Sequence, residues 1–127
     1  MGTPMRVPLP AGYRSVPVGW SGPIPKHYEM VSRWIGESEV RLWLARHGNT
    51  VPPQVGLGGH LSVTEYEGGR VSGTGPIRLD FAFPSEGLQK GGVGRFVLQP
   101  VLNTPIYNVT LHIPPTVDFE RLKKQVR

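Results

Sequence analysis

The sequence of 127 residues contains no cysteine, which excludes disulfide bridges and cysteine-ligated zinc sites. Its four histidines lie far apart and form no HxH or HxxxH pair, so we expect no metal site. No apolar run reaches the ~18 residues that a membrane-spanning helix needs. We therefore expect no membrane partner.

The N-terminal region also lacks the continuous apolar segment of a secretion signal. Its apolar runs are interrupted by Pro4, Pro8, Pro10 and Gly12. We expect the chain to carry no signal peptide of its own. If it is exported, a carrier protein must supply the signal.

Acidic residues are scarce: nine Asp and Glu oppose 14 Lys and Arg, and the formal net charge is +5. A basic excess favours anionic partners such as nucleic acid, phosphorylated nucleotides or an acidic binding protein. Ordinary surface charge explains the excess equally well, because the positive residues are scattered apart from Arg121, Lys123 and Lys124.

Glycine (17 residues) and proline (14 residues) are abundant, but they alternate with apolar runs and so predict many turns and short strands. Residues 1–26 contain six prolines, which predict an extended Pro/Gly-rich arm or linker. Residues 27–127 are predicted to form one domain. The arm can dock on this domain through its larger apolar residues, Tyr13, Val16, Val18 and Trp20.

The domain is expected to be α+β, with a mostly antiparallel sheet of about five strands and two helices. Strands are predicted, in chain order, over 29–35, 60–65, 77–83, 96–98 and 106–113. A helix follows the first strand over 37–47, and a short C-terminal helix covers 116–126 with Thr116 as N-cap. One helical turn over 85–89 precedes a glycine loop.

Two of the predicted strands alternate clearly. Residues 77–83 place Arg78 and Asp80 on one face and the apolar side chains on the other, namely Ile77, Leu79, Phe81 and Phe83. Residues 106–113 alternate as well. There Ile106, Asn108, Thr110 and His112 are predicted to lie opposite Tyr107, Val109, Leu111 and Ile113.

A basic residue and two hydroxyls stand on the strands that flank the first helix. Arg33 lies on the strand before the helix, and Ser62 and Thr64 lie on the strand after it. A cation and hydroxyl groups on neighbouring strands can grip a phosphorylated ligand.

A second set of candidates, also on predicted strands, consists of His60, Arg78, Tyr107 and His112. Such groups can build a metal-independent ribonuclease. One side chain removes the 2′-hydroxyl proton, another protonates the leaving oxygen, and a cation stabilises the charged phosphorane. The competing interpretation is a structural role for each residue.

Five segments follow one another in an order known from one protein class: Val31 to Arg33, Gly36 to Val40, Leu61 to Thr64, Gly75 to Phe81, and Asn103 to Val109. With this order, residues 28–113 resemble the C-terminal toxin domains of bacterial polymorphic toxin systems, of the Rhs, contact-dependent and type VII delivered kind. Among these toxins, the chain is similar to ADP-ribosyltransferase-like domains. These have an Arg or His on the first strand, then a helix, a Pro/Gly-rich loop and a Ser/Thr-bearing strand.

The resemblance implies that NAD is the cofactor, with Arg33 at its phosphates or ribose. Ser62 and Thr64 would order the nicotinamide pocket, and Tyr107 would contribute to NAD binding. Gln99 stands in the region where the family usually has a catalytic glutamate. The chemistry would be transfer of ADP-ribose to a macromolecular target through an oxocarbenium-like transition state.

The same resemblance implies an effector that is secreted by a carrier protein and acts in the target-cell cytoplasm during interbacterial competition. Its partners would be a protein or RNA target and a cognate immunity protein. The first alternative is a metal-independent ribonuclease toxin with a helix before a four-stranded sheet, using His60, Arg78 and His112. The second is a non-enzymatic β-rich binding module, with Trp20, Trp34 and Trp43 as core or interface anchors.

Overall fold

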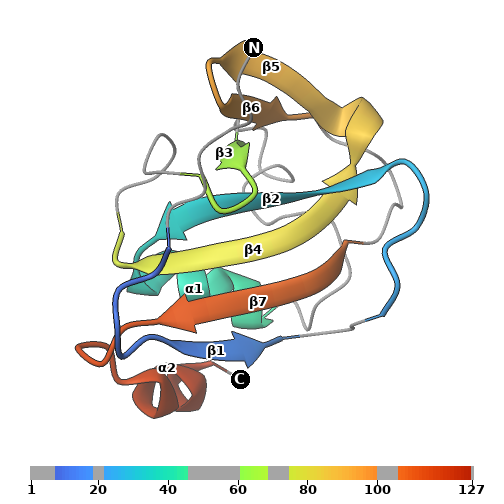
Figure 1. Ribbon diagram of the computed structural model, residues 1–127. Helices are drawn as coiled ribbons and strands as arrows, with labels where there is room; N and C mark the ends of the chain where they lie inside the picture. Colours follow the sequence, from blue (N-terminus) through green and yellow to red (C-terminus); the bar gives the residue numbers. More distant parts are fainter. Residues whose placement is uncertain (1–7, 19–21, 46–60, 69–74, 100–105, 127) are drawn as a thin grey trace.

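The computed structural model describes residues 8–18, 22–45, 61–68, 75–99 and 106–126. In chain order, the elements are β1 (Arg14–Pro17), β2 (Tyr28–Ile35), α1 (Glu37–Ala45), β3 (Leu61–Glu65), β4 (Ile77–Pro84), the 3-10 turn η2 (Ser85–Gly87), β5 (Leu88–Gly92), β6 (Arg95–Leu98), β7 (Tyr107–Ile113) and α2 (Phe119–Gln125). The strands form one antiparallel sheet in the order β1-β7-β4-β2-β3-β6-β5 (Figure 1).

The α+β class, the antiparallel pairing and the two helices are confirmed, but the described part of the sheet has seven strands instead of about five. The two strands that the sequence pattern misses are β1 and β5, which form the two edges of the sheet. β1 lies in the predicted arm, and β5 covers the predicted glycine loop. An edge strand tolerates Pro17 or Gly91 because one of its sides makes no ladder bonds.

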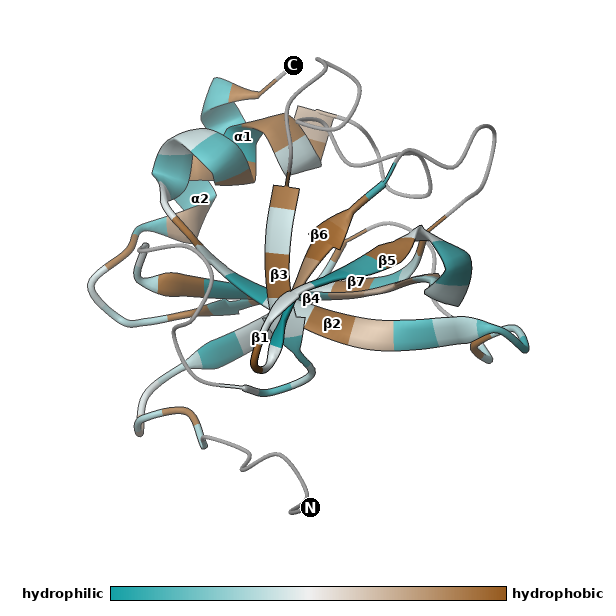
Figure 2. Ribbon diagram, turned by 90° about the horizontal axis from the view of Figure 1, so that it is seen from above, coloured by the Kyte–Doolittle hydropathy of each residue, from teal (hydrophilic) through white to brown (hydrophobic). Residues whose placement is uncertain are grey.

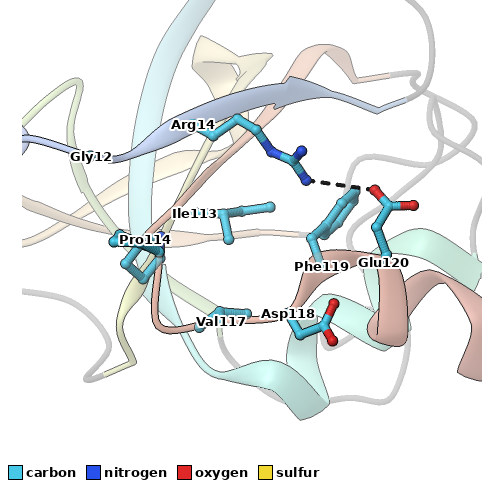
Figure 3. A pocket seen from close by; sticks show the side chains of 9 residues that line it. Gly12, Arg14, Ile113, Pro114, Val117, Asp118, Phe119 and Glu120 are labelled. Atoms are coloured by element: carbon cyan, nitrogen blue, oxygen red, sulfur yellow. Dashed lines mark ion pairs between the residues drawn. The ribbon is translucent and has the colours of Figure 1, made fainter.

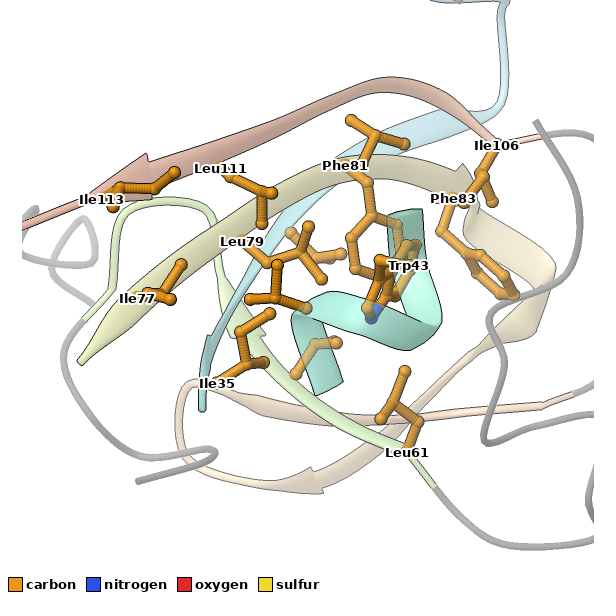
Figure 4. Close-up of a cluster of buried hydrophobic side chains, with 14 of the residues drawn as sticks. Ile35, Trp43, Leu61, Ile77, Leu79, Phe81, Phe83, Ile106, Leu111 and Ile113 are labelled. Atoms are coloured by element: carbon orange, nitrogen blue, oxygen red, sulfur yellow. The ribbon is translucent and has the colours of Figure 1, made fainter. Parts of the chain in front are cut away.

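Both helices lie on the same side of the sheet, as the view from above shows (Figure 2). We call this side the helix face and the opposite side the open face. The helices contribute Val40, Trp43, Phe119 and Leu122 to a core that also contains the apolar side chains of the central strands. Phe81 stands in the middle of this core, with its ring centroid 5.0 Å from that of Trp43 (Figure 4).

The central strand β4 is buried along its whole length. Its alternation confirms the predicted division of side chains. The apolar residues Ile77, Leu79, Phe81 and Phe83 belong to the core cluster, whereas Arg78 and Asp80 point to the open face. A pair of charged residues therefore sits at the centre of the sheet, on the side that carries neither helix.

The alternation predicted for residues 106–113 is wrong at its beginning, because β7 contains a bulge. Asp80 pairs with Thr110 but Ala82 pairs with Tyr107, so β7 has one extra residue between these points. Asn108, with φ 54°, adopts the left-handed conformation there. The bulge turns Ile106 into the core, where it is 1% exposed, and it places Tyr107 on the open face.

The helix ends show one agreement and one correction. α1 begins at Glu37 as predicted, and its predicted last residues, 46 and 47, lie outside the described residues. α2 begins later than predicted, with Asp118 as N-cap instead of Thr116. The Asp118 carboxylate accepts a hydrogen bond from the Arg121 backbone N–H at 3.1 Å, which stabilises the first turn.

Candidate functional site

The Arg33 side chain lies on the helix face, where it is held by other groups of the protein. Its Nε and Nη2 atoms donate to the two carboxylate oxygens of Glu39 at 2.9 and 3.0 Å, and Nη1 donates to the Ser62 carbonyl oxygen at 2.9 Å. Ser62 and Thr64 alternate with core residues on β3, so their side chains point to the open face. The structure does not bring the guanidinium and the two hydroxyls to one surface.

The other residues assigned to an NAD site are spread over the molecule. Thr64 donates its hydroxyl to the Gly94 carbonyl oxygen at 3.1 Å, and Gln99 donates to the Gln89 side chain at 2.7 Å. The ring of Tyr107 meets that of Tyr28 edge-on at 5.2 Å. Burial, with the charge of Tyr107 second, raises the pKa of the Tyr28 hydroxyl above its usual value.

Two members of the ribonuclease set do come together. Arg78 on β4 and His112 on β7 are direct cross-strand partners, and both contact the Asp80 carboxylate. Of the other two members, Tyr107 lies at the beginning of β7 against Tyr28, and His60 lies outside the described residues. We refer to Asp80 and His112 as the dyad. In it, His112 Nε2 lies 2.6 Å from Asp80 Oδ2.

On the open face, three side chains, Ser32, Arg78 and His112, contact the Asp80 carboxylate. Ser32 donates to its Oδ1 at 2.6 Å, and Arg78 donates to both oxygens at 3.1 and 3.0 Å. Burial alone would raise the pKa of this carboxyl. The hydrogen bonds from His112, Ser32 and Arg78, together with the charge of Arg78, outweigh burial and hold the pKa below 3.8. Asp80 is therefore an anion at neutral pH.

The second ring nitrogen of His112 faces a hydroxyl. His112 Nδ1 lies 2.7 Å from Ser15 Oγ, on the neighbouring edge strand β1. The Asp80 carboxylate has no proton to give, so the short contact to Nε2 requires the hydrogen on that nitrogen. In neutral imidazole Nδ1 then carries the lone pair and accepts the Ser15 proton.

Residues around the dyad hold it in place, and a cavity lies beside it. Ser32 accepts a hydrogen bond from the Glu67 backbone N–H at 2.9 Å, and the Glu67 carboxylate lies 3.9 Å from Arg78. A cavity of about 430 Å³ opens next to the dyad. Besides the dyad, it is lined by Ile24, Met30, Tyr66, Asn108 and Thr110.

A second cleft, of about 310 Å³, lies between β1 and α2 (Figure 3). Its polar side chains are paired within the protein. Arg14 forms an ion pair with Glu120 at 3.7 Å, and Asp118 caps α2. Phe119 forms an apolar wall beside Arg14, whose guanidinium carbon lies 5.8 Å from the ring centroid. This cleft has room for a ligand, but the residues that line it include no general base paired with a nucleophile.

Two residues of the open-face site were not predicted as functional residues. Asp80 was assigned to the same face as Arg78, but its central position depends on the pairing of β4 with β7, which the sequence pattern does not specify. Ser15 lies in the proline-rich arm, where no strand was predicted. The sequence does carry one signal for Asp80. Arg78 and Asp80 form a polar i, i+2 pair on an otherwise apolar strand, and buried polar groups need partners.

Among the described residues, no three His, Asp or Glu side chains are grouped so that they could hold a metal ion. None of the described helices is long and apolar enough to cross a membrane. The chain matches no protein-family model, no curated protein and no solved structure.

Proposed function

We propose that this chain is a toxin-type effector domain that cleaves RNA without a metal ion, with His112 as general base. The observation that carries the proposal is the dyad: Asp80 holds His112 Nε2 at 2.6 Å while His112 Nδ1 faces a hydroxyl at 2.7 Å. A base that is oriented by a carboxylate and points its lone pair at a hydroxyl is the arrangement that proton abstraction requires.

In the proposed reaction, the ribose 2′-hydroxyl takes the place of the Ser15 hydroxyl at His112 Nδ1. The imidazole removes the 2′ proton, and the 2′ oxygen attacks the adjacent phosphorus. The bond to the 5′ oxygen breaks on the side of the phosphorus opposite to the 2′ oxygen, so water protonates that leaving oxygen, and the imidazolium releases its proton to water. The products are a 2′,3′-cyclic phosphate and a 5′-hydroxyl end. Arg78 acts through Asp80: after His112 and Ser32, it is the third group whose hydrogen bonds to the carboxylate favour the ionised form.

Charge and shape also support an RNA substrate. The net charge of +5 favours binding of a polyanion. The cavity beside the dyad, at about 430 Å³, falls in the range of sites that hold a nucleotide-sized ligand. Its lining combines an aromatic ring, Tyr66, with the polar side chains of Asn108 and Thr110. These are the group types that stack on a base and hydrogen-bond to it.

The test is incubation of the purified chain with a defined single-stranded RNA in EDTA and without NAD. We expect cleavage products that carry 2′,3′-cyclic phosphate ends. His112→Gln should slow cleavage by at least about 10²-fold, which is the usual contribution of a general base. The matched control is His27→Asn. His27 is exposed and has φ 72°, a conformation that asparagine tolerates.

Three outcomes would overturn the ribonuclease proposal: no cleavage by the intact chain, cleavage that His112→Gln leaves unchanged, or products without a cyclic phosphate. A parallel incubation with labelled NAD addresses the transferase. Label transfer to a macromolecule without RNA cleavage would favour the ADP-ribosyltransferase instead. The effector role predicts toxicity on expression in a bacterial cytoplasm, and a binding module predicts none.

A further inference from the structure

We propose that Ser15 is itself a nucleophile, so that the Ser15, His112 and Asp80 side chains carry out acyl transfer from carboxylic esters. This inference goes beyond the proposed function and does not depend on RNA cleavage. Its basis is a continuous chain of contacts: Ser15 Oγ lies 2.7 Å from His112 Nδ1, and His112 Nε2 lies 2.6 Å from Asp80 Oδ2. A nucleophile, a base and an orienting acid are thus in hydrogen-bond reach of one another.

The protonation states in this chain favour attack by Ser15. Asp80 is ionised, so it holds the imidazole with its hydrogen on Nε2 and its lone pair on Nδ1. The carboxylate is fixed in turn by Ser32 at 2.6 Å and by Arg78 at 3.0 Å, and the Asp80 residue is 2% exposed. Proton transfer from Ser15 to Nδ1 creates an imidazolium, whose positive charge the buried carboxylate stabilises.

Strand pairing places Ser15 at an accessible position. The Val18 backbone N–H donates to the Val109 carbonyl oxygen at 2.8 Å, which identifies this as a hydrogen-bonded pair. Pairs of this kind alternate along an antiparallel ladder, so Ser15 and His112 form a non-hydrogen-bonded pair, in which side chains approach closely. The Ser15 N–H therefore points outward from the sheet edge.

That outward N–H gives the site a donor for a developing oxyanion. β1 is the last strand on its side of the sheet, so no described strand covers this donor. Ser15 is also exposed, which leaves its Oγ open to a substrate that approaches from the edge. The backbone N–H of the attacking serine is a common member of oxyanion holes.

Ser15 Oγ forms a bond to the ester carbonyl carbon while its proton moves to His112 Nδ1. The bond from that carbon to the alcohol oxygen breaks, and the imidazolium gives its proton to the departing alcohol. Water then attacks the acyl-serine and gives its proton to the same imidazole; the bond from the acyl carbon to Ser15 Oγ breaks, and the imidazolium returns the proton to Oγ. The products are a carboxylic acid, an alcohol and the unmodified chain.

The experiment uses the intact chain with p-nitrophenyl acetate and, separately, with a fluorophosphonate probe followed by peptide mass mapping. We expect release of p-nitrophenol and a single phosphonyl adduct on Ser15. Ser15→Ala should abolish the adduct, and His112→Gln should slow its formation by at least about 10²-fold. The matched control is Ser38→Ala, because Ser38 is an exposed serine on α1 and should leave labelling unchanged.

No adduct, an adduct on another serine, or labelling of Ser15 at an unchanged rate in His112→Gln would overturn the proposal. Thermal unfolding of each variant separates loss of chemistry from loss of fold. Ser15→Ala also separates the two proposed activities. It removes the hydroxyl that competes for His112 Nδ1, so RNA cleavage should rise while acylation is lost. A failure of one activity therefore does not imply a failure of the other.

Discussion

Arg33 and Glu39 form a two-point ion pair between β2 and α1, with N–O distances of 2.9 and 3.0 Å. The Arg33 and Glu39 side chains are only 18% and 13% exposed, and Arg33 also holds the Ser62 carbonyl oxygen. The pair therefore attaches the helix to two strands of the sheet. Because the guanidinium of Arg33 and the carboxylate of Glu39 bind each other, we infer a structural role for Arg33.

We predict that Arg33→Ala lowers the free energy of unfolding by about 1–3 kcal/mol, because it removes the cation beside the partly buried Glu39 carboxylate, which keeps the Trp43 indole N–H at 3.4 Å, and removes a donor to the Ser62 carbonyl oxygen. Arg33→Lys should lose less, since it keeps the charge but not the planar fork. Urea denaturation measures both. The control is Arg41→Ala, whose ion pair with Glu37 at 3.9 Å and hydrogen bond to Gln125 at 2.8 Å are more exposed and should contribute less than about 1 kcal/mol. An unchanged stability in Arg33→Ala would contradict the structural role.

The pKa of Asp80 predicts a specific loss of stability in acid. Its folded-state pKa lies below 3.8, the value expected in the unfolded chain. Ionised Asp80 therefore stabilises the folded state fully above about pH 3.8, and this contribution falls as the pH drops through the lower folded value. The stability difference between wild type and Asp80→Asn, measured by urea denaturation, should be large at pH 7 and should shrink below pH 3.8. A difference independent of pH would contradict this linkage.

Gly75 is predicted to tolerate no side chain. A Cβ at this position would collide with the Ile35 carbonyl and the Gly36 nitrogen, which are backbone atoms and cannot turn aside. Gly75→Ala should therefore lower the free energy of unfolding by at least about 2 kcal/mol. Gly36→Ala is the matched control, because a Cβ there meets nothing within 4 Å, and its cost should stay below about 1 kcal/mol. Equal losses in the two variants would contradict the prediction.

The N-cap of α2 predicts different effects on stability for substitutions at two nearby residues, Asp118 and Thr116. Asp118→Ala should cost about 1 kcal/mol, because its carboxylate accepts the Arg121 N–H at 3.1 Å. Thr116→Ala should cost little, since Thr116 is exposed and lies outside the helix. Thermal unfolding of the two variants compares them directly. A larger loss of stability in Thr116→Ala than in Asp118→Ala would contradict Asp118 as the N-cap and would favour Thr116 instead.

The sequence predicts the central strands well because apolar alternation is a local property. β4 was expected over 77–83 and spans Ile77–Pro84, with the expected residues facing the core. The edge strands β1 and β5 show no clear apolar alternation, because each is only four or five residues long and contains proline or glycine. The bulge at Asn108 was missed for a similar reason: one extra residue in β7 shows only when its partner strand is known.

The site was harder to predict than the fold because it depends on pairing between distant segments. Arg78 and His112 could be chosen by residue type, but their contact with Asp80 follows from the β4–β7 register. The Arg33, Ser62 and Thr64 set was chosen by order along the chain. Order along the chain does not determine the face: successive residues of one strand point to opposite faces, and the β2–β3 pairing sets Thr64 opposite Ser32, on the other face from Arg33. The sequence shows which residues of β2 and of β3 share a face within each strand. It does not show how the two strands pair with each other.

The position of β1 also determines when the open-face site is completed during folding. Ser15 and His112 are 97 residues apart in the chain, so their contact closes a loop that contains most of the described residues. During synthesis β1 leaves the ribosome before the other described strands but has no partner until β7 has followed it. Contacts of such long range form late and slowly. The domain therefore acquires its complete site only when nearly all of the described chain has been made.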